Sequence, residues 1–295
     1  MLSSSSTKAN PTSYTTSSVS AGNNGAGLQA GVGNMICFYG GLIYRSFSGG
    51  QGGTVYSINP TTGTGSNVGY VNAYASSICA MKDGVIVTGN FINGNVYALG
   101  TSYYPSYTSI ISSGYIGPLA SDPTGTTLYA RMNDGTIRSW TYSNGTFTQT
   151  AYATANLGTA ALNAISSSPR AMAVGADGTV YLACVYIFSG SAPVYLATIS
   201  PNGNTITTRA ASFSENNADT CSIAIDTDGQ PILLGLFTRQ LHKFPVGSGT
   251  SYRIVPEYTA GPYPTLTILP GSRTIYVNDF TGGVNGLLTT VAPTY

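Results

Sequence analysis

The chain has 295 residues, of which 42% are hydrophobic and only 7% are charged, with eleven Lys and Arg against ten Asp and Glu. This hydrophobic fraction excludes a chain that is disordered for lack of a core. The near-zero net charge excludes nucleic acid as a partner, because binding to phosphates needs a dense row of basic side chains.

The first residues, Met1–Lys8, contain no charged segment followed by an apolar one, so they do not form a secretory signal. No apolar run reaches the roughly eighteen residues of a membrane span. We expect a flexible N-terminal arm over residues 1–12 and one folded domain over 13–295. Uncharged Ser, Thr, Gly and Tyr are abundant, which suits a surface in a changing outside medium, since neutral groups respond little to salt.

A hairpin of two short strands recurs along the chain. Copies spaced by 42 to 52 residues are found at 35–44, 77–87, 118–129, 172–182, 222–233 and 266–277. Several copies turn at Asp-Gly, as at Asp83-Gly84 and Asp177-Gly178, because glycine reaches a positive φ without a Cβ clash. The recurrence predicts six repeats of one structural unit.

Two further strands follow each hairpin. Apolar and polar residues alternate at 53–58, 94–99, 135–140, 193–199 and 239–244, and more polar strands are expected at 67–71, 109–115, 147–153, 205–213 and 252–258. The last repeat has too few residues after Gly283 for both strands. We therefore expect residues 13–21 to supply the missing strand and to close a ring, which removes exposed strand edges.

The turns at Asp122–Tyr129 (Asp-x-x-Gly-x-x-Leu-Tyr) and Asp177–Tyr181 (Asp-Gly-x-Val-Tyr) resemble the repeats of β-propellers of the NHL and YVTN kind. The resemblance covers residues 30–295 at the level of turns and strand pattern. It implies an all-β fold with a single propeller, six four-stranded blades (seven being the alternative) and closure by the N-terminal strand. It implies no activity, because propellers host enzymes, lectins and scaffolds.

Catalytic residues are not evident. His242 is the only imidazole and lies in an alternating strand, which favours a structural or solvent-facing role over a Ser-His-Asp arrangement. Six of the ten acids lie in hairpin turns, which explains their presence: Asp83, Asp122, Asp134, Asp177, Asp226 and Asp228. Glu215 and Asp219 lie in a loop that enters an inner strand, and they are the remaining candidates for a glycosidase pair. A polar loop is the favoured interpretation, so we predict no catalytic residue and no cofactor.

Metal binding is weakly indicated. The segment Asp226-Thr227-Asp228-Gly229 is similar to the start of a calcium loop, but the glutamate expected further on is missing, and a repeat turn is the favoured interpretation. The chain has no His and Cys cluster for zinc. The four cysteines, Cys37, Cys79, Cys184 and Cys221, have no CxxC spacing and are predicted to be buried free thiols.

Partner binding is expected on loops. Loops that join one blade to the next converge on one propeller face, which would gather Tyr74, Arg170, Glu215, Asn216, Asn217, Asp219 and Tyr263. A second tyrosine-rich loop carries Tyr103, Tyr104 and Tyr107. Tyrosine offers a flat apolar face and a hydroxyl, which suits sugar rings and protein partners.

The sequence favours a non-enzymatic virion protein that serves as capsid decoration, spike or tail appendage, with contact to the host surface left open. Its partners would be other virion proteins or a host glycan or protein, and a homo-oligomer on the particle is also left open. Such a chain would reach the virion surface or the extracellular medium without a signal peptide, because particles leave by lysis. The alternatives are a lectin-like, carbohydrate-binding propeller and a polysaccharide-cleaving propeller built around Glu215 and Asp219.

Overall fold

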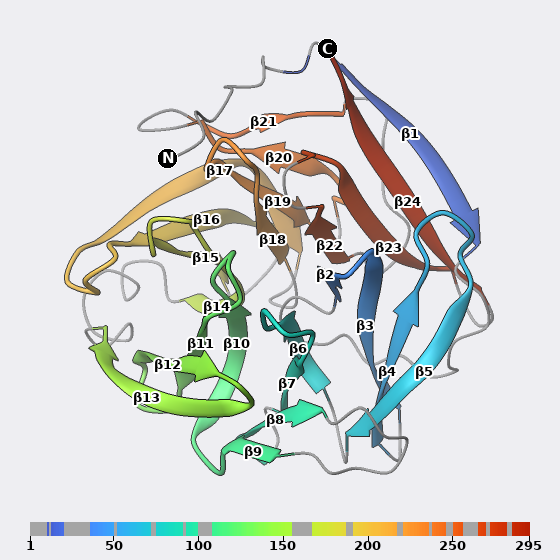
Figure 1. The fold of residues 1–295 in the computed structure, drawn as a ribbon. Helices are drawn as coiled ribbons and strands as arrows, with labels where there is room; N and C mark the ends of the chain where they lie inside the picture. Colours follow the sequence, from blue (N-terminus) through green and yellow to red (C-terminus); the bar gives the residue numbers. More distant parts are fainter. Residues whose placement is uncertain are drawn as a thin grey trace, which may run out of the picture.

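The computed structural model describes residues 11, 13–20, 36–49, 52–71, 75–90, 93–99, 108–154, 167–186, 191–216, 221–235, 238–245, 250–255, 265–269, 272–281 and 285–295. All regular elements in these ranges are strands, which form six antiparallel sheets of four strands each. The sheets surround a common axis as the blades of a propeller (Figure 1). The predicted six-bladed fold is confirmed. The predicted arm over residues 1–12 lies outside the described residues except for Pro11.

Each blade runs from an inner strand at the axis to an outer strand at the rim. The inner strands are β2 (Ile36–Tyr39), β6 (Ala75–Ala80), β10 (Tyr115–Ser121), β14 (Ser167–Val174), β18 (Cys221–Ile225) and β22 (Thr265–Ile268). The second strands are β3 (Leu42–Gly49), β7 (Ile86–Asn90), β11 (Thr127–Met132), β15 (Val180–Tyr186), β19 (Pro231–Gly235) and β23 (Ile275–Thr281). The third strands are β4 (Gly52–Ile58), β8 (Asn95–Leu99), β12 (Ile137–Ser143), β16 (Ser191–Ile199), β20 (Leu241–Lys243) and β24 (Asn285–Thr294). The outer strands are β5 (Gly65–Val71), β9 (Thr108–Ile111), β13 (Thr146–Ala153), β17 (Ile206–Asn216), β21 (Tyr252–Arg253) and β1 (Ser13–Ser20).

The ring is closed by the N-terminal strand, as the sequence predicts. Strand β1 pairs antiparallel with β24, in a register that runs from Ser13 opposite Thr294 to Ser20 opposite Leu287. The hydroxyls of Ser18 and Thr289 lie 2.9 Å apart across this pair. Blade 6 is therefore built from both ends of the chain, and β24 is not left as an unpaired outer edge.

Several predicted strand boundaries are wrong. Within the described residues, the strand expected at 252–258 is limited to Tyr252–Arg253, and the one expected at 239–244 is limited to Leu241–Lys243. The polar strand expected at 109–115 ends at Ile111, and Tyr115 begins the inner strand of the next blade. Between them the chain turns at Gly114, which has a φ of +86°. Ser112, Ser113 and Gly114 are residue types typical of turns, so a signal for this break is present in the sequence.

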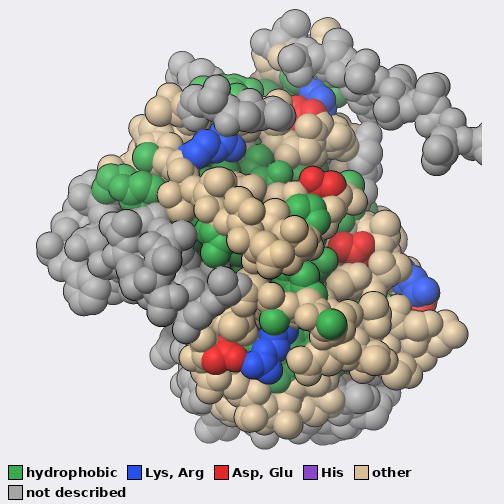
Figure 2. Space-filling model, turned by 90° about the vertical axis from the view of Figure 1, so that its left-hand side faces the viewer, with side chains coloured by type: hydrophobic (Ala, Val, Ile, Leu, Met, Phe, Trp, Pro, Cys, Tyr) green, Lys and Arg blue, Asp and Glu red, His purple; other side chains and the backbone are tan. Residues whose placement is uncertain are grey.

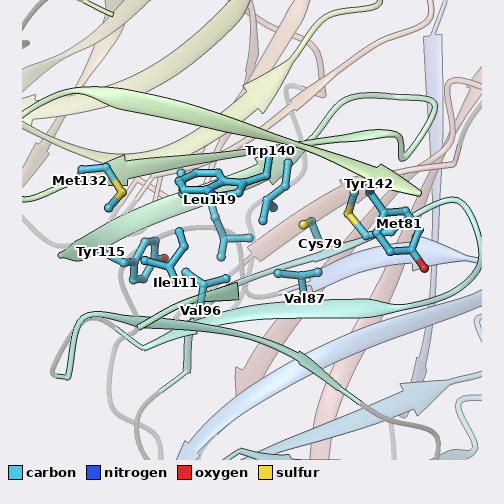
Figure 3. Packing of buried hydrophobic residues seen from close by; sticks show 12 residues of the cluster. Cys79, Met81, Val87, Val96, Ile111, Tyr115, Leu119, Met132, Trp140 and Tyr142 are labelled. Atoms are coloured by element: carbon cyan, nitrogen blue, oxygen red, sulfur yellow. The ribbon is translucent and has the colours of Figure 1, made fainter. Parts of the chain in front are cut away.

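The core consists of apolar clusters between neighbouring blades. Within the described residues there are six such clusters, one at each blade boundary. Between blades 2 and 3, Cys79, Met81, Val87, Val96 and Ile111 face Tyr115, Leu119, Met132, Trp140 and Tyr142 (Figure 3). Burial of each large apolar side chain contributes about 1.5–3 kcal/mol. The blades are therefore held together mainly by packing.

Close packing of this boundary explains the glycine in the middle of β7. A Cβ atom built on Gly89 would lie 2.3 Å from Cζ of Tyr115, a side chain with no exposed surface. Such a separation is far shorter than any van der Waals contact, so only glycine leaves room for the tyrosine ring.

Candidate functional site

A ring of small side chains surrounds the propeller axis. Two residues before each hairpin turn, the six inner strands carry Cys37, Cys79, Ala120, Ala173, Ala224 and Thr267. The residue before each of these is large, apolar and at most 2% exposed, namely Ile36, Ile78, Leu119, Met172, Ile223 and Leu266. Large side chains therefore fill the blade boundaries, and the small ones leave the axis open.

The open axis is a cavity of about 620 Å³. Its walls are formed by this ring together with apolar side chains such as Phe38, Met81 and Ile225, and its hydroxyl groups include those of Ser121 and Thr267. The turns between inner and second strands form the mouth, at Tyr39-Gly40, Lys82, Pro123–Gly125, Ala176 and Thr227. A cavity of this volume, mostly apolar with a few polar groups, is typical of small-molecule sites.

Four charged side chains form a buried ion cluster beside the mouth. Lys243 Nζ lies 2.5 Å from Asp226 Oδ2 and 2.7 Å from Asp228 Oδ2. Arg273, from the next blade, places Nε 3.6 Å from Asp226 Oδ1 and Nη2 3.5 Å from Asp228 Oδ2. Arg273 Nε also donates a hydrogen bond of 3.0 Å to Oγ1 of Thr227. Two acids and two bases cancel, so the cluster joins blades 5 and 6 without net charge.

The closing strand packs close to this cluster. Tyr14 in β1 packs against the apolar cluster between blades 5 and 6. Burial raises the pKa of its hydroxyl strongly, and the negative charge of Asp226 adds to the effect. Tyr14 therefore remains protonated and neutral, and the N-terminal strand covers this boundary with an aromatic ring and no additional charge.

The segment that is similar to a calcium loop is a hairpin turn, as the favoured interpretation predicts. Asp226 N donates to Gln230 O over 2.9 Å, and Gly229 N donates to Asp226 O over 2.9 Å. Both carboxylates lie against Lys243 and Arg273. Within the described part of the chain, no three His, Cys, Asp or Glu side chains converge on a common point.

The other described turn acids have similar structural roles. Asp122 accepts backbone hydrogen bonds from Thr126 (2.8 Å) and Thr127 (2.6 Å). Asp177 accepts from the backbone and the hydroxyl of Thr179, which holds its pKa below the usual value. Asp134 accepts from both the backbone and hydroxyl of Thr136 and lies against Arg138, and its pKa is lowered too. These carboxylates stabilise the turns in which they lie.

His242 is a buried structural side chain. Its Nδ1 lies 3.2 Å from Ser212 Oγ in the neighbouring blade, and its Nε2 lies 3.1 Å from Gln240 Oε1. The ring packs on Phe213 with 4.3 Å between centroids. Burial, assisted by the charge of Arg253, lowers the pKa of His242 to about 4. Among the described side chains, its hydrogen-bond partners are a hydroxyl and an amide, whereas a carboxylate orients the imidazole of a catalytic triad.

The prediction of buried free thiols is confirmed for Cys79 and Cys184, whereas Cys37 is free but only partly buried. Burial raises the pKa of Cys37 well above its ordinary value and that of Cys79 to about 12. These thiols are protonated at neutral pH and act as small apolar groups of the wall. The side chain of Cys221 lies outside the described residues.

The predicted binding residues stay predictions. Arg170, Glu215 and Asn216 lie in described strands, but their side chains are outside the described set. The others lie outside the described residues altogether, namely Tyr74, Tyr103, Tyr104, Tyr107, Asn217, Asp219 and Tyr263. The channel mouth and the ion cluster are on the opposite side of the blades from the loops that join them. The sequence analysis missed both features.

Solved structures with a similar fold belong to different kinds of protein. A streptogramin B lyase is 11% identical over 94% of this chain and 98% of that chain, with a TM-score of 0.57. A luciferin-regenerating enzyme is 14% identical over 95% and 98%, with a TM-score of 0.57. The WD40 domain of Toxoplasma gondii coronin is 8% identical over 97% and 88%, with a TM-score of 0.56. Identities this low show the propeller fold alone.

No family model matches the chain, and no curated protein sequence matches it. In the part of the chain that the structure describes, no helix is long and apolar enough to cross a membrane.

Proposed function

We propose that this propeller is a non-enzymatic interaction protein carried on a virus or phage particle, as capsid decoration, spike or tail appendage. The observation that carries the non-enzymatic part is the engagement of its ionisable groups. Asp122, Asp134 and Asp177 bind their own turns, Asp226 and Asp228 bind buried cations, and His242 is buried and neutral at pH 7.

The outer strands β1, β5, β9 and β13, which carry no charged residue, support a protein partner. Outer strand β13 exposes Thr146, Thr148 and Gln149, and closing strand β1 exposes a row of serines and threonines. Figure 2 shows charged side chains scattered singly or in small groups among uncharged ones on one side of the molecule. A strand edge without charges can pair with another chain. This property favours contacts with further copies or with other particle proteins.

Particle association is tested by purifying particles from the source and following the chain through a density gradient. We expect it to sediment with the particles at a fixed copy number, and to be accessible to antibodies on intact particles. A chain found only in the soluble fraction would rule out the particle role. Binding to host material should change little between low and moderate salt, because the surface has no dense charge.

Catalysis is tested with Glu215→Gln and Asp219→Asn. We expect neither the parent protein nor these variants to release product from a panel of polysaccharides, and Tyr263→Ala to weaken partner binding more than Asp219→Asn does. Product release that both carboxylate variants abolish would make the pair an active site. Binding to a glycan array without product would support the carbohydrate-binding alternative, which the tyrosines at 103, 104 and 107 favour.

A further inference from the structure

We infer that the axial cavity is a binding site for a small, uncharged and mainly apolar molecule, which enters through the mouth formed by the hairpin turns. This site is separate from the blade-joining loops and does not depend on the proposed particle role. The inference rests on the volume of the cavity, on the composition of its wall and on the engagement of the described acidic side chains of that wall within the protein.

The cavity is large because small residues recur at equivalent positions of the six inner strands. At the level of Ala120, Ala173 and Ala224, three neighbouring inner strands carry a methyl group each, and the other three carry Cys37, Cys79 and Thr267. Side chains at this level retain some exposure toward the axis, for example 7% for Ala120 and 8% for Ala173. The resulting 620 Å³ lies within the range of about 300–1,000 Å³ that holds small ligands.

In the described part of the wall, both acidic side chains are already engaged within the protein. Asp226 reaches the cavity but is 3% exposed and is neutralised by Lys243 and Arg273. The carboxylate of Asp122 accepts hydrogen bonds from its own turn. Lys82 is exposed at the rim, where solvent screens its charge. A charged group inside would lose its hydration without gaining a partner.

The functional groups of the wall define the ligand class. The hydroxyls of Ser121 and Thr267 can form a few directional hydrogen bonds, whereas Phe38, Met81 and the ring of small side chains offer apolar contact. The thiols of Cys37 and Cys79 are neutral, because burial raises their pKa. A sugar would need many more polar partners than this wall provides. The site therefore fits an apolar body with one or two neutral polar groups.

The test uses two fluorescent probes with the same anilinonaphthalene body. N-phenyl-1-naphthylamine is neutral, and 8-anilino-1-naphthalenesulfonate carries one negative charge. We expect the neutral probe to bind saturably with one molecule per chain, and the sulfonate to bind at least about tenfold more weakly. Equal affinity for both probes, or an increase in fluorescence that never saturates, would overturn the inference.

Variants that fill the cavity locate the site. Ala224→Phe and Ala80→Phe place a phenyl ring on two different walls, and Ala151→Phe adds the same ring to the exposed outer strand β13 as a matched control. Each variant is used only if it melts cooperatively. We expect either cavity variant to lower the affinity for the neutral probe at least about tenfold and the control to leave it unchanged. Unchanged affinity in a folded cavity variant would refute the location.

A third measurement needs no substitution. N-ethylmaleimide should modify Cys37 more slowly when the neutral probe is bound, because this thiol lines the cavity. Cys184 is buried outside the cavity and serves as the internal reference. Peptide mapping measures the modification rates of Cys37 and Cys184 in the same sample. Equal rates at Cys37 with and without saturating probe would place the probe elsewhere.

Discussion

Replacement of Lys243 by methionine tests the role of the buried ion cluster. The Lys243 side chain is 4% exposed and is the cation nearest to both Asp226 and Asp228, at 2.5 and 2.7 Å. Methionine retains most of the apolar stem, so the change removes mainly the charge. Two buried carboxylates would then share Arg273, whose nitrogens lie 3.6 and 3.5 Å away.

The expected loss is about 3–5 kcal/mol in the free energy of unfolding, which is the usual cost of leaving a buried charge without its partner. Urea unfolding measures it as a lower midpoint at an unchanged m-value. Arg138→Met is the surface control, because the Arg138–Asp134 pair is 35% and 41% exposed and should contribute less than about 1 kcal/mol.

A double variant separates charge from packing. Lys243→Met leaves one negative charge more than Arg273 can neutralise. Adding Asp226→Asn removes that charge, so the double variant should be more stable than Lys243→Met alone. A loss below about 1 kcal/mol in the single variant, or a double variant that is less stable than the single one, would refute the assignment of the cluster as a major link between blades 5 and 6.

Three further predictions concern closure, packing and protonation. Deletion of residues 1–21 removes β1, so the protein should aggregate or lose cooperative melting, and a truncated chain that melts like the parent would show that β1 is dispensable. Gly89→Ala should destabilise the fold by about 1–3 kcal/mol in urea because its Cβ would overlap the Tyr115 ring, whereas Gly69→Ala, whose nearest contact is 3.5 Å, should be tolerated. His242 should titrate near pH 4 by NMR, since burial disfavours the imidazolium. The unfolded chain, with a pKa near 6.5, then binds more protons, so the His242 contribution to stability falls as pH decreases from about 6.5 to about 4, and a folded-state pKa of 6 or above would contradict the burial.

The blade architecture could be predicted because it is encoded locally. Alternation of apolar and polar residues marks each strand, and Asp-Gly turns such as Asp83-Gly84 mark where two strands meet. The closing strand could also be predicted, because the last repeat has too few residues to form its own outer strand. The boundary after Ile111 was missed, although Ser, Ser and Gly at 112–114 are residue types typical of turns.

The ion cluster could not be predicted, because its members are far apart in sequence and meet only through blade register. Lys243 lies two strands away from Asp226, and Arg273 belongs to the next blade. A signal was nevertheless present in Leu241-His242-Lys243-Phe244, where a basic residue follows an apolar strand in a chain with only eleven basic residues. A lysine in such a setting is buried only when acids neutralise it.

To predict the axial cavity, one must know which side chains lie at the same height along the propeller axis, as well as which residues form the inner strands. The equivalence of Cys37 and Cys79 was visible in the sequence, but the equivalence of Ala120, Ala173 and Ala224 depends on hairpin turns of different length. The predicted binding loops depend on residues such as Tyr74 and Asp219, which lie outside the described residues.

The pairing of β1 with β24 determines how the ring responds to mechanical load. Ser13 lies opposite Thr294, so the outward-leading ends of both strands are at the same end of the pair. A force that pulls these two ends apart acts on one rung of hydrogen bonds at a time and peels the pair open, whereas shear would load all rungs together. A propeller pulled at both of its ends would therefore open at the β1–β24 pair at a lower force than one whose strands are loaded in shear.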